Sequence, residues 1–162
     1  MKQAGIVAQV CLSSILLLSG CQALQDAGQD LSTPPKPSIV WNEKKAVAVP
    51  TSSCWSYGSQ SACIDTAAPP EVIGELKPAP LQVQPGAIVT ISYEQPPQEE
   101  SLVLTQWIGS NQVEQEMESG NKWRAPEEPG WYLFDVRAEW EQGSAGHAFV
   151  IEVRTDSRNE YL

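Results

Sequence analysis

The stretch WYLFDVRAEW, residues 131–140, decides the fold. Bulky apolar residues alternate with polar ones along it, as they do in a β-strand that is buried on one face. The opposite face carries Asp135, Arg137 and Glu139, and Trp131 belongs to that face as well. The side chains predicted to face the core are Tyr132, Phe134, Val136, Ala138 and Trp140.

A second strand is expected directly after the first. Residues 141–146, EQGSAG, are typical of a turn, and residues 147–154 again alternate. The inward set of this second strand is Phe149, Ile151 and Val153. The two strands should therefore pair as a terminal hairpin, and Pro129-Gly130 supplies the turn before it.

The rest of the chain contains short apolar runs separated by Pro and Gly. These runs predict strands at residues 38–41, 46–49, 53–57, 62–66, 81–83, 87–93, 101–108 and 122–124. No stretch keeps a clear 3.6-residue apolar period, although residues 111–119 could form a helical turn. Many short strands with turn residues between them predict an all-β protein, a β-sandwich.

Three motifs in the C-terminal half resemble the last strands of an immunoglobulin-like or fibronectin-like domain. They are PGWY at residues 129–132, RAEW at 137–140 and AFVIEV at 148–153, within a resemblance that covers residues 80–154. The resemblance implies an immunoglobulin-like β-sandwich. No cysteine follows Cys63, so the inter-sheet disulfide of antibody domains is absent. Domains of this fold have many roles, so the fold predicts no function.

The N-terminus resembles the signal peptide of a bacterial lipoprotein. Lys2 precedes an apolar run over residues 4–18, and LSGC at residues 18–21 looks like a lipobox. The resemblance implies that residues 1–20 are removed and that Cys21, carrying a diacylglycerol, becomes the N-terminus. The apolar run is shorter than the roughly 20 residues that span a membrane. We expect an extracytoplasmic protein anchored to the bacterial membrane by lipidated Cys21.

Composition divides the remaining chain into three parts. Residues 21–37 are polar and end in Pro34-Pro35-Lys36-Pro37, which predicts a flexible, extended tether. Residues 38–156 hold the predicted β-sandwich domain, and residues 157–162 form a C-terminal tail. We therefore expect one domain held at a distance from the membrane.

The four cysteines are predicted to have different fates. Cys11 leaves with the signal peptide and Cys21 takes the lipid, so Cys54 and Cys63 remain and are expected to form a disulfide in an oxidising compartment. The segment CWSYGSQSACID, residues 54–65, followed by APP at 68–70, also looks like uncharacterised lipoproteins of Bacillus-type bacteria. That second resemblance implies no activity.

Charge and motif content argue against several functions. Asp and Glu number 20 against 10 Lys and Arg, which disfavours nucleic acid and anionic lipid head groups as partners. The alternating Glu114, Glu116 and Glu118 could offer oxygens to Ca²⁺, but a solvated face explains them without a metal. His147 is the only histidine, expected at a strand edge, and no Gly-x-Ser-x-Gly occurs, so no catalytic triad is predicted. We expect no metal and no cofactor.

Aromatic residues are the remaining candidates for function. Some of the six tryptophans should lie in the core, and the sequence leaves open which face of its strand Trp107 occupies. The predicted binding residues are Trp131, which is out of phase with the core set, and Tyr57. We expect a non-enzymatic binding or interaction module for an exported protein or a cell-wall glycan. The alternative is an inhibitory or structural surface protein, and a calcium-binding domain or a hydrolase is less favoured.

Two structural features would separate these partners. An exposed aromatic strip on one face would favour a glycan. An unpaired edge strand or a flat apolar patch would favour a protein.

Overall fold

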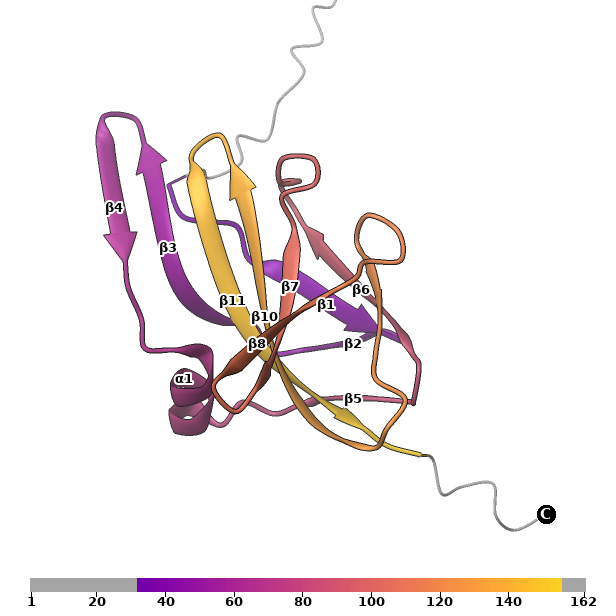
Figure 1. Cartoon of the computed structure of the whole chain (residues 1–162). Coiled ribbons are helices and arrows are strands. Elements are labelled where there is room, and N and C mark those ends of the chain that lie inside the picture. The colour runs from indigo at the N-terminus through magenta and orange to yellow at the C-terminus, as the bar shows by residue number, and fades with distance from the viewer. Residues whose placement is uncertain (1–31, 156–162) are drawn as a thin grey trace, which may run out of the picture.

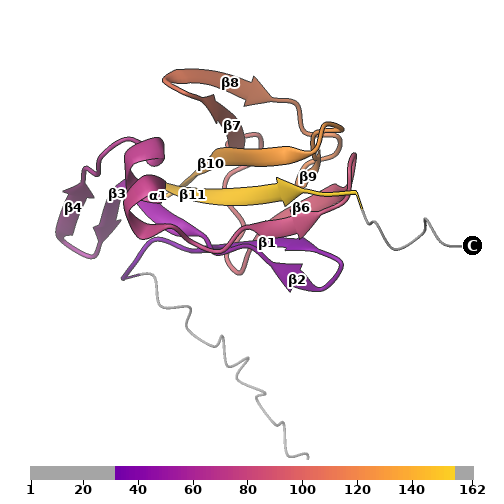
Figure 2. The ribbon, with the colours of Figure 1, turned by 90° about the horizontal axis from the view of Figure 1, so that it is seen from below.

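The computed structural model describes residues 32–155, which form two antiparallel sheets packed face to face (Figures 1 and 2). The predicted all-β sandwich is therefore confirmed. The predicted signal peptide, Cys21 and residues 157–162 lie outside the described residues.

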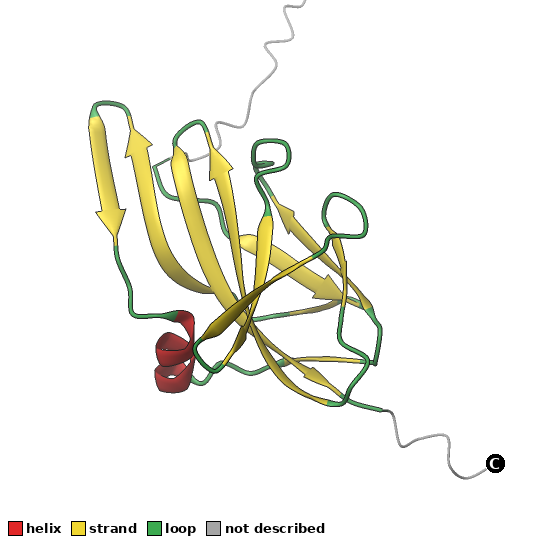
Figure 3. Ribbon diagram, in the orientation of Figure 1, coloured by secondary structure: helices red, strands yellow, loops and turns green. Residues whose placement is uncertain are grey.

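The smaller sheet contains four strands and the larger one seven. The smaller sheet has the order β2 (Lys44–Lys45), β1 (Pro37–Trp41), β6 (Ile88–Tyr93) and β9 (Lys122–Arg124). The larger sheet has the order β4 (Gln60–Ile64), β3 (Val49–Tyr57), β11 (Gly143–Val153), β10 (Gly130–Trp140), β7 (Val103–Ile108) and β8 (Asn111–Gln115). Its seventh strand, β5 (Leu81–Val83), pairs in parallel with the end of β11, and a single helix, α1 (Pro69–Leu76), joins β4 to β5 (Figure 3).

Most predicted strands form, but the strand expected at residues 46–49 was placed wrongly. Residues 46–48 are irregular, and Lys44–Lys45 pair with β1 instead. Asn42 and Glu43 both have positive φ angles, 46° and 66°, and make the two-residue turn of this hairpin. Such a turn matches the twist of the two strands that it joins.

The helical turn expected at residues 111–119 was also wrong. Residues 111–115 form β8, which pairs with β7 so that Gln112 lies opposite Trp107. The tight turn before β8 contains Gly109 with a φ of 63°. Whether a short polar segment such as β8 forms a strand depends on the neighbouring strand with which it pairs. The local sequence pattern does not show that neighbour.

The terminal hairpin is present, but its turn is shorter than predicted. Trp140 pairs directly with Gly143, so only residues 141 and 142 form the turn. The small residues of the segment GSAG, 143–146, lie inside β11. Gly143 passes so close to the backbone of β3 that a Cβ there would overlap the carbonyl oxygen of Cys54. Small residues were needed here for close approach, not for a loop.

The sequence prediction missed α1. Its first two residues are prolines, which are typical of loops but are also accepted in the first helical turn, where no N–H partner is needed. Lys77 ends the helix in a left-handed conformation, and its N–H donates to the carbonyl of Ile73 at 2.8 Å. At eight residues, the helix is too short to show a clear period.

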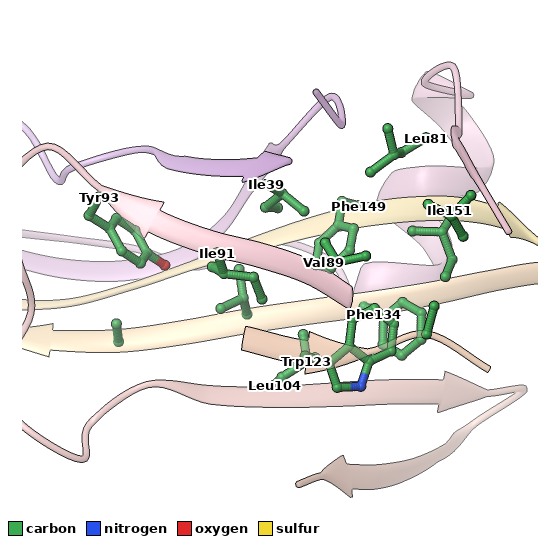
Figure 4. Close-up of a cluster of buried hydrophobic side chains, with 14 of the residues drawn as sticks. Ile39, Leu81, Val89, Ile91, Tyr93, Leu104, Trp123, Phe134, Phe149 and Ile151 are labelled. Carbon is green, nitrogen blue, oxygen red and sulfur yellow. The ribbon is translucent and has the colours of Figure 1, made fainter. Parts of the chain in front are cut away.

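The core lies between the two sheets and is rich in aromatic side chains (Figure 4). Phe134 is fully buried, with its ring centroid 4.5 Å from that of Trp123 and 5.6 Å from that of Phe149. Trp140 contacts Trp55 and Tyr93 edge to face. Of the predicted inward set of β10, all are buried except Tyr132, which is half-buried.

Candidate binding site

The outer face of the larger sheet, turned away from the core, presents two hollows. On this face β10 carries Trp131, Leu133, Asp135 and Arg137, and Trp107 of β7 pairs with Leu133. Helix α1 packs against β3, β10 and β11. One hollow adjoins the segment that leaves α1 and the other adjoins the segment that enters it.

The first hollow, the Trp131 groove, is apolar and has a volume of about 510 Å³. Trp131 is 65 % exposed, although it sits on a central strand. The hydroxyl of Tyr132, which also lines the groove, donates to the carbonyl of Glu128 at 2.8 Å. The remaining lining is mostly apolar and includes Ile73, Pro78, Pro80, Leu133 and Val150.

The second hollow, the Asp135 hollow, is more polar than the first and has a volume of about 340 Å³. It lies between the segment before α1 and the strands β7 and β8. Its functional groups come from four strands: Thr51, Thr105, Trp107, Gln112, Asp135 and Arg137.

Asp135 is a half-buried carboxylate at the centre of this hollow. The hydroxyl of Thr51 donates to its Oδ1 at 3.0 Å. Burial raises the pKa of the Asp135 carboxyl, while the Thr51 hydrogen bond and the nearby Arg137 charge act in the opposite direction. Arg137 is held in place by a hydrogen bond from its Nη2 to the carbonyl of Ser52 at 3.1 Å.

Gly146 makes room for both of these side chains. It lies opposite Arg137 in the β10–β11 ladder. A Cβ at this position would overlap the hydroxyl of Thr51 and would come within 3.5 Å of the Arg137 guanidinium. The absent side chain therefore allows Thr51 to reach Asp135.

Trp107 lines the Asp135 hollow and carries a buried donor without a partner among the described residues. Its indole Nε1 is buried and has no hydrogen-bond partner among residues 32–155. A buried N–H without a partner costs about 1–3 kcal/mol unless a ligand or water accepts from it. The sequence left open which face of its strand Trp107 occupies. In the structure Leu104 faces the core, so Trp107 faces outward.

The two predicted binding residues do not lie together. Trp131 pairs with Glu152, whereas Tyr57 lies just beyond Trp55, which pairs with Gly143. Glu152 and Gly143 are nine residues apart on β11, a distance of about 30 Å along a strand. Tyr57 is 55 % exposed at the tip of the β3–β4 hairpin. No other aromatic side chain among residues 32–155 is exposed, so no exposed aromatic strip joins the two within that range.

The predicted disulfide joins the strands of this hairpin. Cys54 and Cys63 are cross-strand neighbours with Cα atoms 4.0 Å apart and an S–S distance of 2.11 Å. Next to it, the hydroxyls of Ser56 and Ser61 are hydrogen-bonded at 2.8 Å. The disulfide therefore braces β4, an edge strand whose five residues are all exposed.

His147 does not lie at a strand edge, which corrects the expectation from sequence. It pairs with Val136 on the core face of β11 and is 3 % exposed, and its Nδ1 has no partner among the described residues. Burial, with a smaller effect from the charge of Lys36, lowers the pKa of His147 to about 4. Asp135 is on the opposite face of the sheet, so the two side chains cannot act together.

Within residues 32–155, no group of three or more His, Cys, Asp or Glu side chains could hold a metal ion. Glu118 forms an ion pair with Arg124 at 2.6 Å, and Glu116 lies outside β8. No helix in this range has the length and apolar character needed to cross a membrane.

Sequence reasoning missed the Asp135 hollow. The alternation along β10 does place Asp135 and Arg137 on the outward face, but it does not show which strands and loops surround them. Thr51 is 84 residues away from Asp135 in the chain. Only the pairing of β3 with β11 brings Thr51 near, and no local signal predicted it.

No family model, curated protein or solved structure matches the chain. The immunoglobulin-like or fibronectin-like type of the sandwich stays a prediction, and so does the lipoprotein resemblance. Function must therefore be argued from the two hollows and the sheet edges.

Proposed function

We propose that this protein is a non-enzymatic interaction module, anchored outside a bacterial membrane by a lipid on Cys21, that binds another exported protein through the Trp131 groove. The observation that carries the proposal is the exposed indole of Trp131 in a mostly apolar groove, whose lining also includes Lys77. Large aromatic side chains in such positions are frequent anchors of protein interfaces.

The chemistry of the groove favours a protein over a glycan. A sugar is held by several polar groups placed around its hydroxyls. The groove lining is largely aliphatic and proline-rich, and the Tyr132 hydroxyl is already bonded within the chain. An aliphatic or aromatic side chain of a partner protein would fill this groove without leaving polar groups unpaired.

An uncharged sheet edge supports the same partner class. Among the edge strands of the two sheets, β2 carries two lysines, β9 carries Lys122 and Arg124, and β8 carries Glu114. Charges of this kind prevent a further strand from pairing with an edge. In contrast, the short edge strand β5 has no charge, and the longer β4 has none either, nor has any residue from 46 to 64. The β4 edge is open to a strand from another protein.

The arrangement of titratable groups supports a non-enzymatic role. The single histidine is buried on the core face, while Asp135 and Arg137 are on the outer face. General acid–base catalysis needs groups within hydrogen-bond reach of one substrate. His147 and Asp135 do not meet that condition.

The anchor is tested by replacing Cys21 with alanine. The C21A chain should incorporate no fatty acid and should leave the membrane fraction, because no other anchor is proposed. Labelling with an alkyne fatty acid, followed by fractionation, measures both effects. The control is C11A, which removes a thiol from the predicted signal peptide and should leave labelling unchanged. Labelling of C21A, or loss of labelling in C11A, would contradict the assignment.

The groove is tested with a photo-crosslinking phenylalanine analogue in place of Trp131, in cells of the native host. We expect one discrete adduct with an exported protein, identified by mass spectrometry. The purified partner should then bind W131A at least tenfold more weakly than the unmodified chain. The control position is Val113 in β8, which is 44 % exposed and does not line the groove.

Other outcomes of this experiment would count against the proposal. A heterogeneous adduct that a cell-wall hydrolase collapses would identify a glycan instead. Equal adducts at positions 131 and 113 would show that the groove is not selective. If the partner is found and its own activity falls on binding, the alternative of an inhibitory surface protein is favoured.

A further inference from the structure

We infer that the Asp135 hollow is a second binding site, separate from the Trp131 groove, and that its ligand is one neutral sugar residue. This site does not depend on the proposed function, because none of its groups lines the groove. It is lined by side chains that carry both donor and acceptor atoms, and its volume suits one ring.

The central pair of the hollow offers an acceptor beside a donor. Asp135 and Arg137 are two residues apart on one face of β10, so their Cα atoms are about 7 Å apart. They make no ion pair with each other, since Thr51 engages the carboxylate and Ser52 engages the guanidinium. A sugar hydroxyl donates to one neighbour and accepts from another, so adjacent hydroxyls on a ring can use both groups.

Trp107 and Gln112 complete the site on the other side. Trp107 lines the hollow, and its Nε1 is buried without a partner among the described residues. Its indole also offers an apolar surface to the C–H groups of a sugar. Gln112, directly opposite Trp107 in the β7–β8 ladder, adds an amide with both donors and an acceptor.

Charge and volume narrow the ligand class. An anion would be attracted by Arg137 but repelled by Asp135. A cation would be attracted by Asp135 but repelled by Arg137. A zwitterion would satisfy both charges yet leave Trp107 and Gln112 unused. The volume, about 340 Å³, is near the lower end of the range of ligand pockets, about 300–1,000 Å³, and suits a single ring.

The test uses the purified full chain in micelles of a detergent without sugar head groups. Saturation-transfer NMR is recorded with three neutral probes, cellotriose, maltotriose and tri-N-acetylchitotriose, and with the zwitterion alanyl-alanine. We expect saturation of one ring of at least one trisaccharide and none of alanyl-alanine. D135A and W107F should each weaken that binding at least tenfold, and W107F does so by removing only the indole N–H and part of the ring.

Matched variants keep the result specific. E139A removes another carboxylate from the same face of β10, outside the hollow, and should bind normally, as should W131A. Thermal unfolding of each variant confirms that it is folded. The inference is overturned if no trisaccharide binds, if alanyl-alanine binds in its place, or if folded D135A and W107F bind as well as the unmodified chain. Normal sugar binding by W131A would also separate this site from the groove.

Discussion

Replacing Gly143 with alanine is expected to destabilise the sandwich by about 3 to 5 kcal/mol. Gly143 has a φ of 146°, which side chains rarely adopt, and it lies opposite Trp55 in the β11–β3 ladder. An added Cβ would overlap the carbonyl oxygen of Cys54 and would lie 3.2 Å from the Cα of Trp55. These are backbone atoms, so the strands must separate. The measurement is the free energy of unfolding by denaturant.

Gly58 provides the matched control for this substitution. It has a φ of 60° at the tip of the β3–β4 hairpin, and no atom lies within 4 Å of a Cβ built there. G58A should therefore show only the conformational penalty, about 1–2 kcal/mol. If G143A loses no more than G58A, the close approach of β11 to β3 is contradicted.

Replacing Phe134 with alanine is expected to cost about 3–5 kcal/mol. The side chain is fully buried at the centre of the core, between the rings of Trp123 and Phe149. Its removal deletes apolar contact with both sheets and leaves a cavity that the surrounding strands cannot close. Chemical denaturation of F134A against the unmodified chain measures the loss.

The control is W131A, which removes a large aromatic side chain from an exposed position on the same strand. W131A removes a larger aromatic side chain, but one that is 65 % exposed, so its stability should change by no more than about 0.5 kcal/mol. A large loss in W131A would show that this indole is structural and would weaken the proposal for the groove. A small loss in F134A would contradict the placement of the core.

Some features of the fold can be predicted from a single strand, whereas others depend on contacts between strands that are far apart in the chain. The alternation in residues 131–140 correctly placed Phe134 in the core and Trp131 outside it, because the side-chain period of a strand is local. The same reasoning failed at residues 143–146, where small residues look like a turn. Their size is explained only by β3, whose contact with β11 does not appear in the local sequence.

In the candidate sites, too, single residues could be predicted from one strand, but their surroundings depend on distant parts of the chain. Trp131 could be predicted as an exposed aromatic residue, but its groove depends on α1 and the prolines after it, which lie more than 50 residues earlier in the chain. Tyr57 could be predicted as a second aromatic candidate, yet the register places it at the other end of the sheet. The Asp135 hollow could not be predicted, because Thr51, Trp107 and Asp135 meet only after the four strands β3, β11, β10 and β7 have paired.

By itself, the sequence determined the all-β class, most strands, the core face of β10 and the Cys54–Cys63 pair. The first three features depend on the alternation of side chains, which is visible within each strand. The cysteine pair depends on how many cysteines the sequence leaves over. Only the tertiary structure decided which strands are neighbours, which uncharged strands lie at an edge and which polar groups share a hollow. Strand pairing joins residues far apart in the chain, and its register is set by the packing of whole faces against one another.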